Sequence, residues 1–512
     1  MRWRELFRVK SLDRLAAETE HPDQQLKRTL GPVQLTGLGV GAVIGAGIFS
    51  TVGTAAAGGA EHVGAGPALV VSFFLVAIAC GFAALCYAEF TSLIPVAGSA
   101  YTYAYGTLGE LAAWIIGWDL ILEYAVGNVA VAISWSDYFQ TLLRGFHLTW
   151  PLWLGVDYRS AIQAAHQIAG LNAHGGDVNG LDATVLRSAQ ALADAPHVAG
   201  IPILFNLPAV LIVAAITWVL VRGIRESARF NTTMVVLKLL VIGIFVVVGA
   251  FYVKPENWTP FAPNHFKGIS SAAAIIFFAY IGFDAVSTAA EETREPQRNM
   301  PIGILASLAV CTVIYIAVAM VLTGMLRWDQ YAGAADPLAK AFEQRGLTWM
   351  AGIISFGAVF ATTSVLLVFQ LGQPRIFFAM ARDGLLPQWA ARVHPKYRTP
   401  HVTTILTGVA VAGFAAVSNI NEVVELCNIG TLFAFVVVAV GIIVLRRADP
   451  GRVRPFRTPW YPWVPLGAIG SCLWLMAELP WVTWARFILW LGIGLVIYFA
   501  YSRRHARVKK NI

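Results

Sequence analysis

The chain has 512 residues, of which 57% are hydrophobic and only 13% are charged, and its mean hydropathy is +0.64. Soluble proteins carry roughly 25% charged residues, so this composition excludes soluble multidomain enzymes and disordered proteins. It predicts an all-α integral membrane protein. The formal net charge of +8 would suggest nucleic-acid binding in a soluble protein, but in a membrane protein the side on which each charge lies matters more.

The apolar residues are grouped into long segments. A membrane-spanning helix needs about 20 predominantly apolar residues, and twelve segments approach or exceed this length. We therefore predict twelve transmembrane helices. Their approximate bounds are Val33–Ala57, Pro67–Phe90, Tyr101–Phe139, Ile203–Val221, Thr232–Val253, Ile269–Ala290, Pro301–Leu326, Thr348–Phe378, Val402–Val417, Val423–Leu445, Trp463–Leu479 and Val482–Tyr501.

The basic residues are distributed unequally between the two sides of these spans. With the N-terminus placed inside, 27 lysine and arginine residues lie in cytoplasmic segments, nine lie outside and Lys238 lies within a span. Because cytoplasmic loops are enriched in Lys and Arg, we predict that both termini are cytoplasmic. The basic N-terminal arm, residues 1–32, also contains acidic residues and precedes a long apolar run, which argues against a signal peptide.

One external loop, residues 140–200, is long, polar and rich in alanine. We predict two short helices in it, at Arg159–Gly170 and Asp182–Asp194. The loop contains no motif with an assignable chemistry, so a solvated or interfacial lid is favoured over a binding role.

The first predicted span is unusually rich in glycine, with five glycines between Gly37 and Gly47. Glycine inside a helix costs about 1 kcal/mol relative to alanine. Close helix packing also uses small residues, but the triplet Gly45-Ala46-Gly47 is denser than packing requires. We therefore predict a helix break at this triplet, where the free amides of Ala46 and Gly47 would suit a carboxylate.

The sixth predicted span has a second interruption, because Gly282 follows an apolar run and precedes Asp284 by two residues. A break at Gly282 would turn backbone carbonyls inward, where they suit an ammonium group. Spans one and six each begin a five-helix half of the chain. Interruptions at corresponding positions of two halves indicate a transporter site between inverted repeats, so the sequence predicts a zwitterionic substrate between the breaks.

Ionised side chains within the spans are rare, and each costs about 2.5–3.5 kcal/mol at mid-membrane. Lys238 has no polar neighbour along its helix, and we predict that it binds and releases a proton during transport; the alternative is a lysine that snorkels to the surface. Glu123 shares a helix face with Asp119 and is predicted to influence the site directly or by pairing. Asp284 is predicted to cap the second half of span six or to act in gating.

The sequence predicts neither a metal site nor an enzyme. The five cysteines lie in apolar segments without metal-ligand spacing, so we expect no disulfide and no zinc site. The spans contain no pair of catalytic acids, no nucleophile with a base and no metal-ligand spacing. We therefore expect no catalytic residues, no cofactor and no bound metal.

Seven stretches, taken together and in order, resemble the amino acid–polyamine–organocation superfamily of permeases, and specifically the bacterial cationic amino acid transporter family. They are Gly41–Phe49, Cys86–Phe90, Pro95–Tyr103, Gly117–Tyr124, Phe277–Val286, Ala290–Pro296 and Gln373–Pro387.

The resemblance implies a five-plus-five inverted repeat, with repeats at residues 33–253 and 269–445 and with two additional helices and a cytoplasmic tail at residues 446–512. It implies that backbone amides bind the substrate carboxylate, that carbonyls of span six bind its ammonium group, and that Phe278 or Ile281 forms a gate. It assigns proton coupling to Lys238, whose ammonium group would replace the sodium ion of sodium-coupled relatives. The substrate-binding residues predicted from the breaks and the resemblance are Ile44, Gly45, Ala46, Gly47, Phe278, Ala279, Ile281 and Glu123.

From these features we predict a secondary active transporter that imports L-amino acids across the bacterial inner membrane by proton symport with alternating access. An uncoupled amino acid exchanger is the alternative, and a membrane-embedded sensor is a remote one. The expected partners are an L-amino acid, protons and the lipid bilayer, with no nucleic acid. Because "cationic" is a family label and the predicted pocket walls are apolar, the sequence leaves open whether the substrate is cationic or neutral.

Overall fold

The computed structural model describes residues 8–10, 28, 30–59, 62–94, 96, 98–148, 150–173, 181, 183–223, 228–397 and 399–506. Most of the predicted N-terminal arm and the last residues of the predicted C-terminal tail lie outside the described residues. In chain order the elements, in which η marks a 3₁₀ or π segment, are α2 (Pro32–Val43), η2 (Gly47–Thr51), α3 (Val52–Ala57), η3 (Gly66–Ala68), α4 (Leu69–Leu93), α5 (Ser99–Thr107), α6 (Glu110–Ile121), η4 (Leu122–Val126), α7 (Gly127–Gly145), η5 (Leu152–Leu154), α8 (Tyr158–Ala173), α9 (Ala183–Ala193), β1 (His197–Val198), β2 (Ile201–Pro202), α10 (Leu207–Arg222), α11 (Ala228–Ala250), η7 (Pro255–Trp258), α12 (His265–Ile276), η8 (Phe277–Tyr280), η9 (Asp284–Glu292), α13 (Pro296–Met325), η10 (Trp328–Tyr331), α14 (Pro337–Glu343), α15 (Thr348–Arg382), η11 (Gln388–Ala391), α16 (His401–Val417), α17 (Ile420–Ala448), α18 (Trp463–Ala477), α19 (Trp481–Ile497), η12 (Tyr498–Ser502) and α20 (Arg503–His505).

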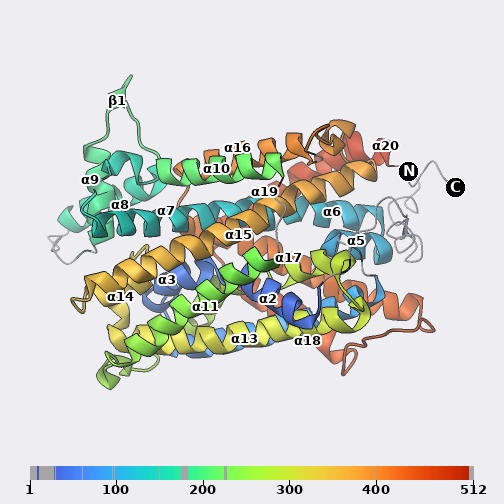
Figure 1. Cartoon of the computed structure of the whole chain (residues 1–512), viewed down its shortest axis with the longest axis horizontal. Coiled ribbons are helices and arrows are strands. Elements are labelled where there is room, and N and C mark those ends of the chain that lie inside the picture. Colours follow the sequence, from blue (N-terminus) through green and yellow to red (C-terminus); the bar gives the residue numbers. More distant parts are fainter. Residues whose placement is uncertain are drawn as a thin grey trace.

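The long helices form a bundle and run roughly along one direction (Figure 1). One end of the bundle carries α8, α9, β1 and α14, and we name it the α9 end. The opposite end carries α5 and α20, and we name it the α20 end (Figure 1). The bundle interior is packed with aliphatic and aromatic side chains, whereas many large apolar side chains on its outer face are exposed, among them Leu211, Trp218 and Val313. An apolar outer face is what a surrounding bilayer requires.

Eight helices of the described chain are long and apolar enough to cross a membrane, and the bent pair of α2 with η2–α3 raises this number to nine. The predicted spans that begin near Ile203, Val402 and Trp463 correspond to the shorter apolar helices α10, α16 and α18. The integral membrane character is therefore supported by the structure, while the full number of twelve spans stays a prediction.

The third predicted span, Tyr101–Phe139, is wrong at both ends. Its first residues belong to the separate helix α5, and the continuous helical span runs from Glu110 to Gly145 through α6, η4 and α7. Gly109 separates the two helices with a φ of +97°, a conformation that favours glycine. Apolar composition alone gave no sign of this turn.

In the described part of the long loop between α7 and α10, both predicted short helices are confirmed as α8 and α9. They pack on each other around a small apolar cluster that includes Ala161 and Ala191. The hairpin of β1 and β2 follows them and was not anticipated from the sequence. All five cysteines are buried, each within one of the apolar segments.

Candidate functional site: two broken helices in contact

The first break lies at the glycine triplet, as predicted. Helix α2 ends at Val43, and Ile44 adopts an extended conformation with a ψ of 99°. The chain resumes as the π segment η2, and the two halves are bent by 45°. The amide nitrogens of Ile48 and Phe49 donate to the carbonyl of Gly45. The amides of Ala46 and Gly47 thus lie at the start of the second half, where a helix has no partners of its own for its first N–H groups.

The second break is also confirmed. Helix α12 ends at Ile276, continues as one 3₁₀ turn, and stops at Ile281, which is extended with a ψ of 135°. Gly282 follows with a φ of +115°. The remainder of the span, η9, is a 3₁₀ helix rather than an α-helix. Both interruptions that the sequence singled out are therefore present in the structure.

The two breaks touch each other through their backbones. A Cβ atom on Gly47 would lie 2.2 Å from the Cα atom of Ala279, and a Cβ atom on Gly282 would lie 2.9 Å from the carbonyl oxygen of Ala42. Such distances are far inside normal van der Waals contact. Glycine is therefore required at both positions.

Two uncharged polar residues that the sequence analysis missed hold the carbonyls at the breaks. The hydroxyl of Tyr315, on α13, lies 3.0 Å from the carbonyl oxygen of Val43 and 2.9 Å from that of Ala279. The side-chain amide of Asn428, on α17, donates to the carbonyls of Ala274 at 2.7 Å and Ile275 at 3.2 Å. A search for single polar residues inside apolar spans, rather than for charges alone, would have found both.

Lys238 reaches the first broken helix from α11. Its ammonium group donates to the carbonyl oxygen of Gly41 at 2.5 Å, and the residue is only 1% exposed. The side chain therefore does not snorkel to the surface in this conformation. Gly41 lies in the last turn of α2, immediately before the break. Among the described residues, Lys238 is the only cation that contacts this segment, and its partner is a backbone carbonyl.

Glu123 and Asp284 lie side by side. The carboxyl groups are close enough to interact directly, and both residues are buried. Asp284 is itself the first residue of η9, and neither of its carboxylate oxygens has a hydrogen bond of ordinary geometry within the described chain. The carboxyl group of Asp284 also interacts with the backbone amides of Gly282, Asp284 and Ala285, and the capping or gating role of Asp284 stays a prediction. The neighbour of Glu123 is thus another acid and not the basic group expected for pairing, and its influence on the site stays a prediction.

The site is closed to solvent in this conformation. Ile44, Ala46, Phe278 and Ile281 are each at most 4% exposed. The carbonyls of Phe278 and Ala279 each have one partner, the amide of Ile281 and the hydroxyl of Tyr315. Since a carbonyl oxygen has two lone pairs, each can still accept a second hydrogen bond from an ammonium group.

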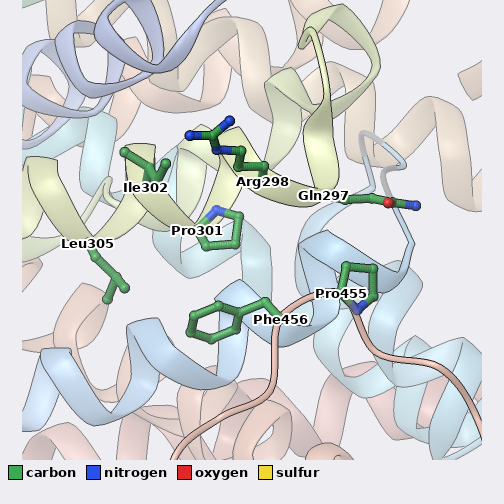
Figure 2. A pocket seen from close by; sticks show the side chains of 7 residues that line it. All are labelled: Gln297, Arg298, Pro301, Ile302, Leu305, Pro455 and Phe456. Carbon is green, nitrogen blue, oxygen red and sulfur yellow. The ribbon is translucent and has the colours of Figure 1, made fainter.

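A cavity at the α20 end offers a contrast. It has a volume of about 410 Å³ and lies between the start of α13 and the segment that holds Pro455 and Phe456. Its walls are mostly apolar, and the guanidinium group of Arg298 points away from Phe456 (Figure 2). None of the predicted site residues lines it, and it lacks the paired donors and acceptors that a zwitterion needs.

A bundle of membrane-length helices in which two broken helices face each other is the architecture of a secondary transporter. The comparisons agree: the chain belongs to the amino acid permease family, whose model matches residues 30–512. It is therefore an integral membrane transporter rather than an enzyme, and the resemblance predicted from the sequence motifs is confirmed.

Two relatives from Bacillus subtilis (strain 168) match almost the full length. The chain is 47% identical over 506 residues to a branched-chain amino acid permease and 46% identical over 506 residues to a methylthioribose transporter, with 99% of both chains covered in each case. It is also 36% identical over 428 residues to a chloroplastic cationic amino acid transporter of Arabidopsis thaliana, covering 83% of this chain and 67% of that protein.

Proposed function

We propose that the protein imports neutral L-amino acids of the branched-chain class by proton symport with alternating access. The observation that carries this proposal is the 2.5 Å bond between the ammonium group of Lys238 and the carbonyl of Gly41. This bond links the ammonium group, which can lose a proton, to the helix turn that immediately precedes the break. The amides of the break would hold the substrate carboxylate. Release of the proton would weaken this bond and allow the first broken helix to move.

The proposed architecture is that of the sequence analysis: twelve spans, inverted repeats at residues 33–253 and 269–445, and two further helices within residues 446–512. The unequal distribution of the basic residues between the loops of the sequence supports a cytoplasmic position for both termini. The bacterial relatives support the inner membrane as the location.

The proposed binding mode uses the backbone at both breaks. The amides at Ile44–Gly47 would bind the carboxylate, and the carbonyls of Phe278 and Ala279 would bind the ammonium group. Ile44, Phe278 and Ile281 would surround the side chain, and Phe278 or Ile281 would act as the gate. Apolar walls of this kind suit a branched aliphatic side chain.

The walls of the proposed pocket support a neutral substrate over a cationic one, because Ile44, Phe278 and Ile281 are apolar. The name of the branched-chain amino acid permease, which shares 47% identity with this chain, points in the same direction.

Methylthioribose is a second candidate substrate, because a relative of nearly equal identity is named for it. That molecule has neither a carboxylate nor an ammonium group, so it would leave the two sets of backbone groups at the breaks without charged partners. Uptake of radiolabelled L-isoleucine and of methylthioribose into proteoliposomes decides between them. Saturable uptake of methylthioribose without uptake of isoleucine, leucine or valine would overturn the amino acid proposal.

The experiment for coupling compares the wild type with Lys238→Ala in proteoliposomes. With an acidic exterior, the wild type should accumulate L-isoleucine, whereas Lys238→Ala should fail to accumulate it and still bind it in a thermal-shift assay. Unimpaired pH-driven accumulation in the variant contradicts the role of Lys238. If the wild type itself exchanges internal for external isoleucine but ignores the pH gradient, the protein is an exchanger.

A further inference from the structure

A cavity of about 440 Å³ lies at the α9 end, between the last turns of α7, the loop helix α9 and the segment from Asp329 to Gln344. Its volume falls within the range of about 300–1,000 Å³ that is typical of small-molecule sites. Neither the breaks nor the proposed coupling residue contributes to its walls. The cavity is therefore separate from the site between the broken helices.

Charged groups of both signs face this cavity. On α7, Asp137, Thr141 and Arg144 lie three or four residues apart and so share one helix face. Arg187 enters from α9, and Asp336 enters from the start of α14. A cavity lined in this way presents cations and carboxylates together, which is the pattern that a zwitterion would match.

Arg144 and Arg187 both line this cavity, and the carboxylates that act on Arg144 are those of Asp336, Glu343 and Asp137. The guanidinium of Arg187 is near enough to repel that of Arg144. Arg144 donates to the hydroxyl of Thr141 at 2.6 Å and lies 3.9 Å from the carboxylate of Asp336. Arg187 has no acidic partner among the described residues. A carboxylate placed between the two guanidinium groups would relieve their repulsion and gain charge-assisted hydrogen bonds.

The wall that carries Arg187 is anchored to the bundle. Arg159, on α8, pairs with Glu422 at 2.9 Å, and Glu422 also pairs with Arg486 at 2.9 Å. The side-chain amide of Asn419 donates to the hydroxyl of Ser160 at 2.8 Å. Because α9 packs on α8, these contacts hold the loop helices in place, and the cavity is a built part of the fold.

Two elements that carry cavity residues, α7 and α14, also contact the segment that follows the first break. Tyr138, next to Asp137 on α7, donates its hydroxyl to the carbonyl of Phe49 at 2.5 Å, and the two rings pack edge to face. Helix α14 also packs against η2. The cavity is therefore one layer of side chains away from the segment that begins with Gly47, on the side of the molecule that we propose to be external.

We propose that this cavity is an antechamber that binds a zwitterionic amino acid before it reaches the breaks. Arg144 and Arg187 hold the α-carboxylate, and Asp137 and Asp336 face the ammonium group. The long external loop, through α9, completes this second site. The inference rests on the proposed amino acid substrate, but it requires two binding sites where the proposed function requires one.

The test is the number of L-[³H]isoleucine molecules bound per full-length protein in detergent at saturation. The wild type should bind two, and Arg187→Gln should bind one. In uptake assays the variant should show a KM raised about threefold to fivefold, as expected for one partly exposed charged contact. Lys254→Gln is the control, because Lys254 is exposed, lies outside the cavity and loses the same charge.

Arg187→Lys keeps the charge but not the fork of donors, and its stoichiometry should stay at two with weaker binding at one site. A stoichiometry of one in the wild type, or of two in Arg187→Gln with an unchanged KM, overturns the antechamber while leaving transport at the breaks intact. Absence of isoleucine binding to the wild type overturns the proposed substrate and the antechamber with it. Thermal unfolding midpoints equal to that of the wild type would establish that each variant is folded.

Discussion

The contact between the broken helices and the cavity at the α9 end differ in the groups that line them. At the breaks, the backbones of the two helices approach each other closely, and Tyr315, Asn428 and Lys238 bond to backbone carbonyls. No side chain of the predicted pocket is more than 4% exposed. In the cavity at the α9 end, charged side chains supply the polar groups. Stability and transport should therefore be sensitive to small changes of side-chain volume at the breaks, and to pH and salt at the cavity at the α9 end.

The largest effect is expected from Gly47→Ala. The added Cβ atom would lie 2.2 Å from the Cα atom of Ala279, and backbone cannot move aside as a flexible side chain does. We expect a loss of stability of about 3 kcal/mol or more and loss of isoleucine uptake. Gly37→Ala, in the same helix, is the matched control, because a Cβ atom there meets nothing within 4 Å. Equal behaviour of the two variants, by thermal unfolding and uptake, would contradict the contact between the breaks.

A smaller effect is expected at the cavity at the α9 end, where the substitution of Asp336 should stabilise the protein and not destabilise it. Burial raises the pKa of Asp336 from 3.8 to about 6. At a pH between these two values, Asp336 therefore keeps a proton in the folded protein that it has already lost in the unfolded chain. The contribution of Asp336 to stability therefore falls as the pH rises from about 4 to 6, by roughly 1–3 kcal/mol.

Asp336→Asn should remove this fall, so that the variant becomes more stable than the wild type by a margin that grows as the pH rises to 6 and then stays constant. Thermal unfolding of the full chain at pH 4, 5, 6 and 7 measures the difference. Asp329→Asn, in the same cavity but half-exposed, is the control. A difference between Asp336→Asn and the wild type that does not change with pH would refute the buried position of this carboxyl group.

Tyr315→Phe should cost about 1 kcal/mol, the net worth of a buried hydrogen bond, and should lower the maximal rate of isoleucine uptake. It removes the hydroxyl that joins Val43 to Ala279 without leaving a large cavity. Tyr331→Phe removes a hydroxyl bonded at 2.7 Å to the carbonyl of Leu322, which belongs to neither break. Both variants should lose similar stability, but only Tyr315→Phe should slow uptake. Equal uptake rates would show that Tyr315 is a packing residue only.

The smallest effect is expected from Glu422→Gln, which breaks the ion pairs with Arg159 and Arg486. Exposed ion pairs contribute about 0.2–1 kcal/mol and are screened by salt. The difference in unfolding midpoint from the wild type should therefore shrink between 50 mM and 500 mM NaCl. A difference that persists at high salt would mean that the loop is anchored chiefly by packing and not by charge.

The amino-acid sequence by itself determined the membrane character, the family and the two positions at which helices break. These properties depend on local features that a linear pattern records: long apolar runs, a glycine triplet, and a glycine followed by an acid inside a span. Lys238 was also identifiable, because a lone ammonium group in an apolar run has no local explanation.

The tertiary structure decided which groups meet. Tyr315 and Asn428 lie far along the chain from the carbonyls that they hold, so no spacing rule connects them. The proximity of Glu123 to Asp284, and the assembly of the cavity at the α9 end from α7, α9 and α14, likewise depend on how distant helices pack. Neither the turn at Gly109 nor the cavity could be predicted from the sequence. Apolar composition indicates which segments enter the membrane. The backbone conformation and the neighbours of each residue are set only when the helices pack together.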